Sequence, residues 1–157
     1  MKPKVYLETT VISYLTSRPS RDLVVAAHQE LTRQWWETSR ESFVVLVSEL
    51  VIREVSRGDP AAAEQRRGVL VGIEILETTM EAVVLAEQLI QQGPLPRTAA
   101  EDALHIAIAV TNGVDYLLTW NCAHIANAAI RRTIDEVCIV HGYQPTVLCT
   151  PEELLKE

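Results

Sequence analysis

Short apolar runs alternate with longer amphipathic segments along the whole chain, and this alternation constrains the fold more than any other feature. The apolar runs are three to five residues long, rich in β-branched and aromatic residues, and fall at residues 5–7, 43–47, 73–76, 116–118 and 146–149. Strands that alternate with helices form a parallel sheet with helices on both faces. We therefore expect an α/β protein, a three-layer α/β/α sandwich around a central, mostly parallel sheet of about four to five short strands.

The segments between these runs repeat apolar residues at three- and four-residue spacing, which predicts helices. Thr98 has Glu101 three residues after it, and this spacing predicts a capping box at the start of one helix. Thr9 and Thr10 are expected to cap the first helix. Helices are expected at residues 11–15, 21–41, 48–56, 61–70, 79–92, 98–112 and 122–134, with a terminal turn at 151–155.

Length and composition indicate a single globular domain that spans residues 1–157. Hydrophobic residues make up 48% of the chain and charged residues 22%, a balance that argues against disorder. Cys122, Cys138 and Cys149 form no CxxC pair, so we expect buried free thiols in a reducing compartment. The chain shows no signal peptide and no apolar run of the ~18–20 residues that span a bilayer. We expect a cytoplasmic protein without a membrane segment.

The net charge of −7, from 21 acidic and 14 basic residues, argues against a protein that coats nucleic acid through bulk charge. It does not exclude a nuclease, because some of the acidic residues can hold a cation.

Polar residues follow the predicted strands at the edge where ligands bind in open α/β sheets. Glu8 follows the first strand, Glu54 lies beyond the second, Asp102 opens a helix and Asn121 follows the fourth strand. Carboxylates that converge in one cleft repel each other, and Mg²⁺ or Mn²⁺ relieves that repulsion. Such an ion also promotes hydrolysis of a phosphodiester. The pattern therefore suggests a metal-dependent nuclease, although the spacing by itself is weak support.

Four segments resemble, in order, the motifs of the PIN domain. They are the strand and acidic residue at 5–13, the serine and glutamate at 48–54, the aspartate and Ala-rich helix at 101–107, and the strand and threonine turn at 116–121. The resemblance covers essentially the whole chain.

This resemblance implies a Mg²⁺- or Mn²⁺-dependent ribonuclease, most often the VapC-like toxin of a bacterial type II toxin–antitoxin pair. It implies that Glu8, Glu54 and Asp102 are metal ligands and that Asn121 occupies a fourth polar position. Thr9 or Thr119 is then expected to hydrogen-bond the cluster or a metal-bound water. It further implies an RNA substrate, a homodimer and a small antitoxin partner.

Two departures from the family pattern leave an alternative open. The family usually has aspartate where this chain has Glu8 and Asn121, so the site carries three formal negative charges, enough for one tightly bound ion. The alternative function is a catalytically degenerate PIN domain that binds protein or RNA. His105 is interpreted as a packed histidine on the face of Asp102, and His124 as a possible contact to phosphate.

Overall fold

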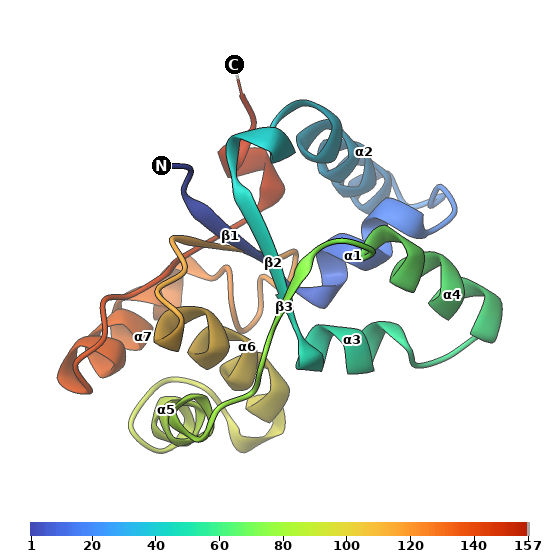
Figure 1. The fold of residues 1–157 in the computed structure, drawn as a ribbon. Helices are drawn as coiled ribbons and strands as arrows, with labels where there is room; N and C mark the ends of the chain where they lie inside the picture. Colours follow the sequence, from blue (N-terminus) through green and yellow to red (C-terminus); the bar gives the residue numbers. More distant parts are fainter. Residues whose placement is uncertain (157) are drawn as a thin grey trace.

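The computed structural model describes residues 1–156 and has a five-stranded sheet at its centre (Figure 1). All strand pairs are parallel, and the order across the sheet is β3-β2-β1-β4-β5. The strands are β1 (Lys4–Leu7), β2 (Val44–Ser48), β3 (Glu74–Leu76), β4 (Tyr116–Leu118) and β5 (Val147–Cys149). Each lies within two residues of a predicted strand, so the expected sheet is confirmed.

Helices cover both faces of the sheet, which confirms the three-layer α/β/α sandwich. Figure 1 shows the first four helices on one side of the sheet and the last three on the other. The first group is α1 (Thr9–Thr16), α2 (Leu23–Thr38), α3 (Glu49–Val55) and α4 (Pro60–Val69). The second group is α5 (Met80–Gln91), α6 (Ala100–Thr111) and α7 (Ala128–Val140), and short 3-10 turns lie at Arg40–Ser42, Arg97–Ala99 and Pro151–Leu154.

The central strand β1 is buried on both faces, because helices pack above and below it. Val5, Tyr6 and Leu7 are each 0% exposed. Tyr6 lies between Leu46 of β2 and Leu117 of β4 in the register of the sheet. This two-sided burial explains why the strand appears in the sequence as a continuous apolar run rather than as an alternating one.

The predicted cap of α6 is wrong. Residues Arg97–Ala99 form a 3-10 turn, and α6 begins at Ala100 after Ala99, which has no capping side chain. Glu101 instead forms a bidentate ion pair with Arg57, with N–O distances of 3.3 and 3.0 Å. Thr98 lies inside this 3-10 turn, so its hydroxyl is not at the N-cap position of α6. The caps predicted at Thr9 and Thr10 are also wrong, because Glu8 caps α1.

The helix predicted at residues 122–134 begins six residues later and ends six residues later, since α7 spans Ala128–Val140. The carbonyl of Asn121 accepts hydrogen bonds from the amides of Ile125 and Ala126, which closes a turn at that point. The side chain of Asn127 then caps α7 by accepting from the amide of Ala129. The turn at Asn121 and the cap at Asn127 therefore place the start of α7 later than predicted.

The cysteines differ in environment, so the expectation of three buried thiols is wrong for Cys122. Cys122 is exposed, whereas Cys138 and Cys149 are buried. Burial raises the pKa of Cys138 to about 11 and that of Cys149 to about 12. Among the described residues, no helix has both the length and the apolar character required to cross a bilayer.

We expect a thiol-reactive reagent at pH 8 to modify Cys122 alone in the folded protein. A thiol with a pKa near 11 is only about one part in a thousand thiolate at that pH, and burial also blocks access. Mass spectrometry after a short exposure to iodoacetamide should show one adduct, and three adducts in denaturant. A Cys122→Ser variant that still gains an adduct when folded would contradict this assignment.

Candidate metal centre

The site lies at the carboxyl edge of the sheet, beside the point where the connections change direction. From β1 the chain continues to β2 and β3 on one side of β1, whereas β4 and β5 lie on the other side. Such a switch point is where open α/β sheets bind ligands. The amide of Glu8, the first residue after β1, donates to the carbonyl of Leu118 at the end of β4, with an N–O distance of 3.0 Å.

Glu8 is a buried carboxylate, 4% exposed, and its charge is met by hydroxyl and amide groups. Its Oε1 accepts from the Oγ1 atoms of Thr10 at 2.5 Å and Thr119 at 2.7 Å, and from the amide of Thr10 at 3.2 Å. It also caps the N-terminus of α1, where the helix dipole favours negative charge. These donors fix the side chain without neutralising it.

Glu54 comes from α3, which begins after β2 with Ser48 as its N-cap. Its Oε1 accepts from Oγ1 of Thr9 at 2.5 Å and is 2.6 Å from Nε2 of His105. Burial alone would raise the pKa of Glu54, but its hydrogen bonds, above all the one to His105, outweigh burial and lower the pKa to about 2. Glu54 is therefore a carboxylate at neutral pH.

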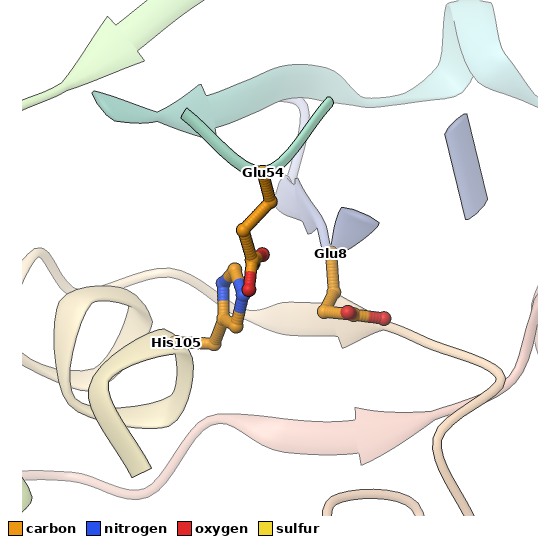
Figure 2. A group of neighbouring side chains, drawn as sticks. All are labelled: Glu8, Glu54 and His105. Atoms are coloured by element: carbon orange, nitrogen blue, oxygen red, sulfur yellow. Dashed lines mark hydrogen bonds and ion pairs between the residues drawn. The ribbon is translucent and has the colours of Figure 1, made fainter. Parts of the chain in front are cut away.

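Glu8, Glu54 and His105 form a compact group in which each residue offers one ligand atom, and these three atoms lie within 4.8 Å of one another (Figure 2). Both carboxylates use Oε1 for their hydrogen bonds to hydroxyl, amide and imidazole groups. No lysine or arginine in that range pairs with Glu8 or Glu54. Two fixed carboxylates that form no direct ion pair with a lysine or arginine among the described residues fit a hard divalent cation.

Asp102 lies in the first turn of α6, three residues before His105. Its Oδ2 is 3.0 Å from Nδ1 of His124, and it lies outside the 4.8 Å group. The structure thus brings together two of the three carboxylates that the sequence suggests as ligands and pairs the third with His124. A ligand role for Asp102 stays a prediction.

A chain of hydrogen bonds connects the loop after β4 to the site. Oγ1 of Thr119 donates to Glu8 and accepts from the amide of Asn121, and Oδ1 of Asn121 accepts from the amide of His124. Thr9 and Thr119 therefore both contact the carboxylates, as the resemblance implies for one of them. The Asn121 side chain shapes the loop in this arrangement, and its role as a fourth polar position stays a prediction.

Trp120 fixes the same loop to the helical layer. Its indole stacks on the ring of His28, with centroids 4.0 Å apart, and on the ring of Tyr14, with centroids 6.3 Å apart. Its Nε1 donates to Oγ1 of Thr32, and its amide donates to Oγ1 of Thr10. The residue is 9% exposed, so it packs within the protein.

Tyr6, Thr10 and His105 are parts of the site that sequence reasoning did not assign to it. The interpretation of His105 as a packed histidine agrees with its 0% exposure, but the side chain also bonds Glu54. One signal was available, because His105 follows Asp102 by one helical turn. Tyr6 gave no signal, since an aromatic residue in a buried strand is ordinary.

Several solved structures are similar to this fold, and two of them are toxin structures. One is VapC20 of Mycobacterium tuberculosis, described as a sarcin-ricin loop cleaving toxin. The two sequences are 15% identical, the match covers 77% of this chain and 92% of VapC20, and the TM-score is 0.61. The other is VapBC2 from Rickettsia felis, solved bound to a DNA fragment from their promoter. The sequences are 17% identical, the match covers 82% of this chain and 92% of the matched chain, and the TM-score is 0.56. The sequence matches no family model and no curated protein. The PIN-like fold expected from the sequence is thus confirmed.

Proposed function

We propose that this protein is a metal-dependent endoribonuclease that hydrolyses RNA phosphodiester bonds, acting in the cytoplasm as the toxin of a type II toxin–antitoxin pair. One observation carries the proposal: Glu8 and Glu54 are held side by side at the sheet's switch point, each fixed by hydrogen bonds to its Oε1. The likeness to the fold of VapC structures supports it.

Glu8 and Glu54 would hold the cation, Mg²⁺ or Mn²⁺, with Asp102 as the third carboxylate. When bound, such an ion supplies Lewis acidity at the phosphate and activates water. The protein's own contribution is to fix the ligands before the ion arrives, because Thr9, Thr10 and Thr119 already hold the carboxylates. Fixed ligands avoid the entropic cost of ordering flexible carboxylates on binding.

The charge of the site supports one tightly bound ion. Glu8, Glu54 and Asp102 contribute three formal negative charges, and Asn121 contributes none. Three carboxylates suffice for one divalent cation and are less favourable for two. Anomalous scattering from crystals soaked in Mn²⁺ should show one fully occupied site without nucleic acid, and two fully occupied sites would contradict the proposal.

Cleavage of RNA by the wild-type protein is the direct test. We expect cleavage of structured or single-stranded RNA with Mg²⁺ or Mn²⁺, and loss of cleavage in EDTA that is restored by excess metal. A protein that binds Mn²⁺ weakly or not at all and leaves both RNAs intact would instead support the degenerate, RNA- or protein-binding PIN domain.

Asp102→Asn should weaken Mn²⁺ binding by at least about 10-fold, because it removes one of three proposed anionic ligands. Isothermal titration with Mn²⁺ measures the dissociation constant. Asp115→Asn is the matched control, since Asp115 precedes β4 at the opposite edge of the sheet and accepts from the amide of Lys4. Equal affinities in wild type and Asp102→Asn would remove Asp102 from the ligand set.

The same test addresses His124, which binds Asp102 through Nδ1. A phosphate contact, the role suggested for His124, predicts that His124→Gln raises the KM for RNA and leaves the Mn²⁺ affinity close to that of the wild type. A lowered Mn²⁺ affinity with an unchanged KM would assign His124 to the support of Asp102 instead.

A small antitoxin partner and a homodimeric state are parts of this proposal. The Rickettsia felis neighbour was solved as VapBC2. Light scattering should give a mass twice the 17.5 kDa of the chain. A small open reading frame directly upstream, whose product copurifies with this chain and suppresses RNA cleavage, would support the antitoxin.

A further inference from the structure

A buried line of hydrogen bonds leads from the N-cap of α3 through the central strand to Glu54. Oγ of Ser48 is 2.7 Å from the hydroxyl of Tyr6, and that hydroxyl is 2.7 Å from Nδ1 of His105. Nε2 of His105 is 2.6 Å from Oε1 of Glu54. Ser48, Tyr6 and His105 are each 0% exposed, so solvent does not compete for these groups.

The number of hydrogens in this line determines its direction. The buried phenol of Tyr6 carries a single hydrogen at neutral pH, because an ordinary tyrosine titrates only at about pH 10. Ser48 has one hydroxyl hydrogen, and its Oγ already accepts from the amide of Val51. Glu54 is a carboxylate and can only accept. The hydrogen between His105 and Glu54 therefore belongs to Nε2.

A neutral imidazole with its hydrogen on Nε2 satisfies every group. Ser48 then donates to Tyr6, Tyr6 donates to Nδ1 of His105, and Nε2 donates to Glu54. The other neutral tautomer would bring an unprotonated Nε2 against a carboxylate. An imidazolium would force Tyr6 to donate to Ser48, and the buried Ser48 hydrogen would have no acceptor among the described residues, at the cost of a lost hydrogen bond.

We propose that His105 is a positioning residue, which holds Glu54 through an Nε2–H hydrogen bond set by Tyr6 and Ser48, and that it is not a metal ligand. The inference rests on the proposed function in that Glu54 binds the cation. Both ring nitrogens are occupied, Nδ1 as an acceptor and Nε2 as a donor, so neither offers a free lone pair to an ion. A neutral donor fixes Glu54 and leaves its full charge for the cation.

The tautomer is measured directly on the wild-type protein by two-dimensional NMR with ¹⁵N-labelled histidine, with His105 assigned by comparison with His105→Gln. We expect Nε2 to resonate as a protonated nitrogen and Nδ1 as an unprotonated one, both before and after saturation with Mg²⁺. A hydrogen on Nδ1, or loss of the Nε2 hydrogen when Mg²⁺ binds, would overturn the proposal.

Substitutions separate positioning from ligation. His105→Leu should weaken Mn²⁺ binding by between about 10- and 100-fold, the effect of removing a group that orients a ligand. His105→Gln supplies an amide N–H in place of Nε2–H and should recover most of the affinity. Tyr6→Phe removes the hydrogen that fixes the tautomer and should weaken binding to a smaller extent. Unchanged affinity in both His105→Leu and Tyr6→Phe, with folding verified by circular dichroism, would contradict the proposal.

Tyr116→Phe is the matched control, because Tyr116 lies in the neighbouring strand and its hydroxyl makes no hydrogen bond within residues 1–156. It should bind Mn²⁺ as the wild type does. These measurements do not use RNA, so a failure of the proposed function can be distinguished from a failure of the proposal for His105. A wild-type protein that binds Mn²⁺ but cleaves no RNA refutes the ribonuclease proposal, whereas the tautomer and the Mn²⁺ affinities still decide the role of His105.

Discussion

Glu54→Gln is expected to lower the rate of metal-dependent RNA cleavage by more than about 100-fold. Removal of a group that only orients a ligand typically costs 10–100-fold, and Glu54 is itself a proposed ligand. The glutamine carbonyl can still accept from Thr9 and His105, so the side chain keeps its place while its charge is lost. Single-turnover cleavage of RNA in saturating Mg²⁺ measures the rate, and titration with Mn²⁺ measures the affinity.

Glu49→Gln is the matched control for this substitution. Glu49 begins the same helix, α3, and its contact with the amide of Thr78 is exposed. It should cleave RNA at the wild-type rate. Because the pKa of Glu54 is lowered to about 2, the folded protein stabilises the charged form, so Glu54→Gln should lower the melting temperature, and folding at the assay temperature is verified by circular dichroism. Cleavage by Glu54→Gln at the wild-type rate would remove Glu54 from the site, and a loss shared equally by Glu49→Gln would point to a nonspecific cause.

The second large effect concerns stability, and it is expected at the centre of the sheet. Leu117→Ala should lower the free energy of unfolding by about 2–5 kcal/mol, because it removes a fully buried side chain and leaves a cavity. Leu117 lies in β4 between Tyr6 of β1 and Leu148 of β5, where neighbouring backbones limit collapse into the space. Urea denaturation followed by circular dichroism measures the change.

Leu23→Ala is the control for the loss of volume alone. Leu23 begins α2 and is 86% exposed, so its truncation should change the free energy of unfolding by less than about 0.5 kcal/mol. Similar losses in the two variants would mean that the sheet centre is not packed as described.

The strands could be predicted from the sequence because burial on both faces leaves a clear pattern. Residues 5–7 of β1 and 117–118 of β4 are 0% exposed, and each strand appears as an unbroken apolar run. Helix ends were harder to predict, because they depend on which side chain reaches which amide. Thr98 has the sequence of a capping residue, but a 3-10 turn places it before the helix. Residues 122–127 contain no glycine or proline that would exclude a helix.

The site could be predicted only in part, and for a related reason. Glu8 directly follows a strand and Glu54 lies on the helix after one, so topology alone places them at one edge. The contact between Tyr6 and His105 joins residues 99 apart in the sequence, and it depends on the rotation of α6 about its own axis. Neither residue type indicates that contact. The pairing of Asp102 with His124 likewise depends on side-chain conformation, which the spacing of the two residues in the sequence does not determine.

The position of β4 beside β1 also affects when the carboxylate site can form during synthesis of the chain. Glu8 leaves the ribosome early, yet Thr119, one of its two hydroxyl donors, lies 111 residues later in the sequence. A chain that has not yet emerged through β4 lacks that donor, and β1 lacks one of its two neighbouring strands. Contacts of such high sequence separation also form slowly. A nascent chain is therefore kept from completing its carboxylate cluster until most of it has been made.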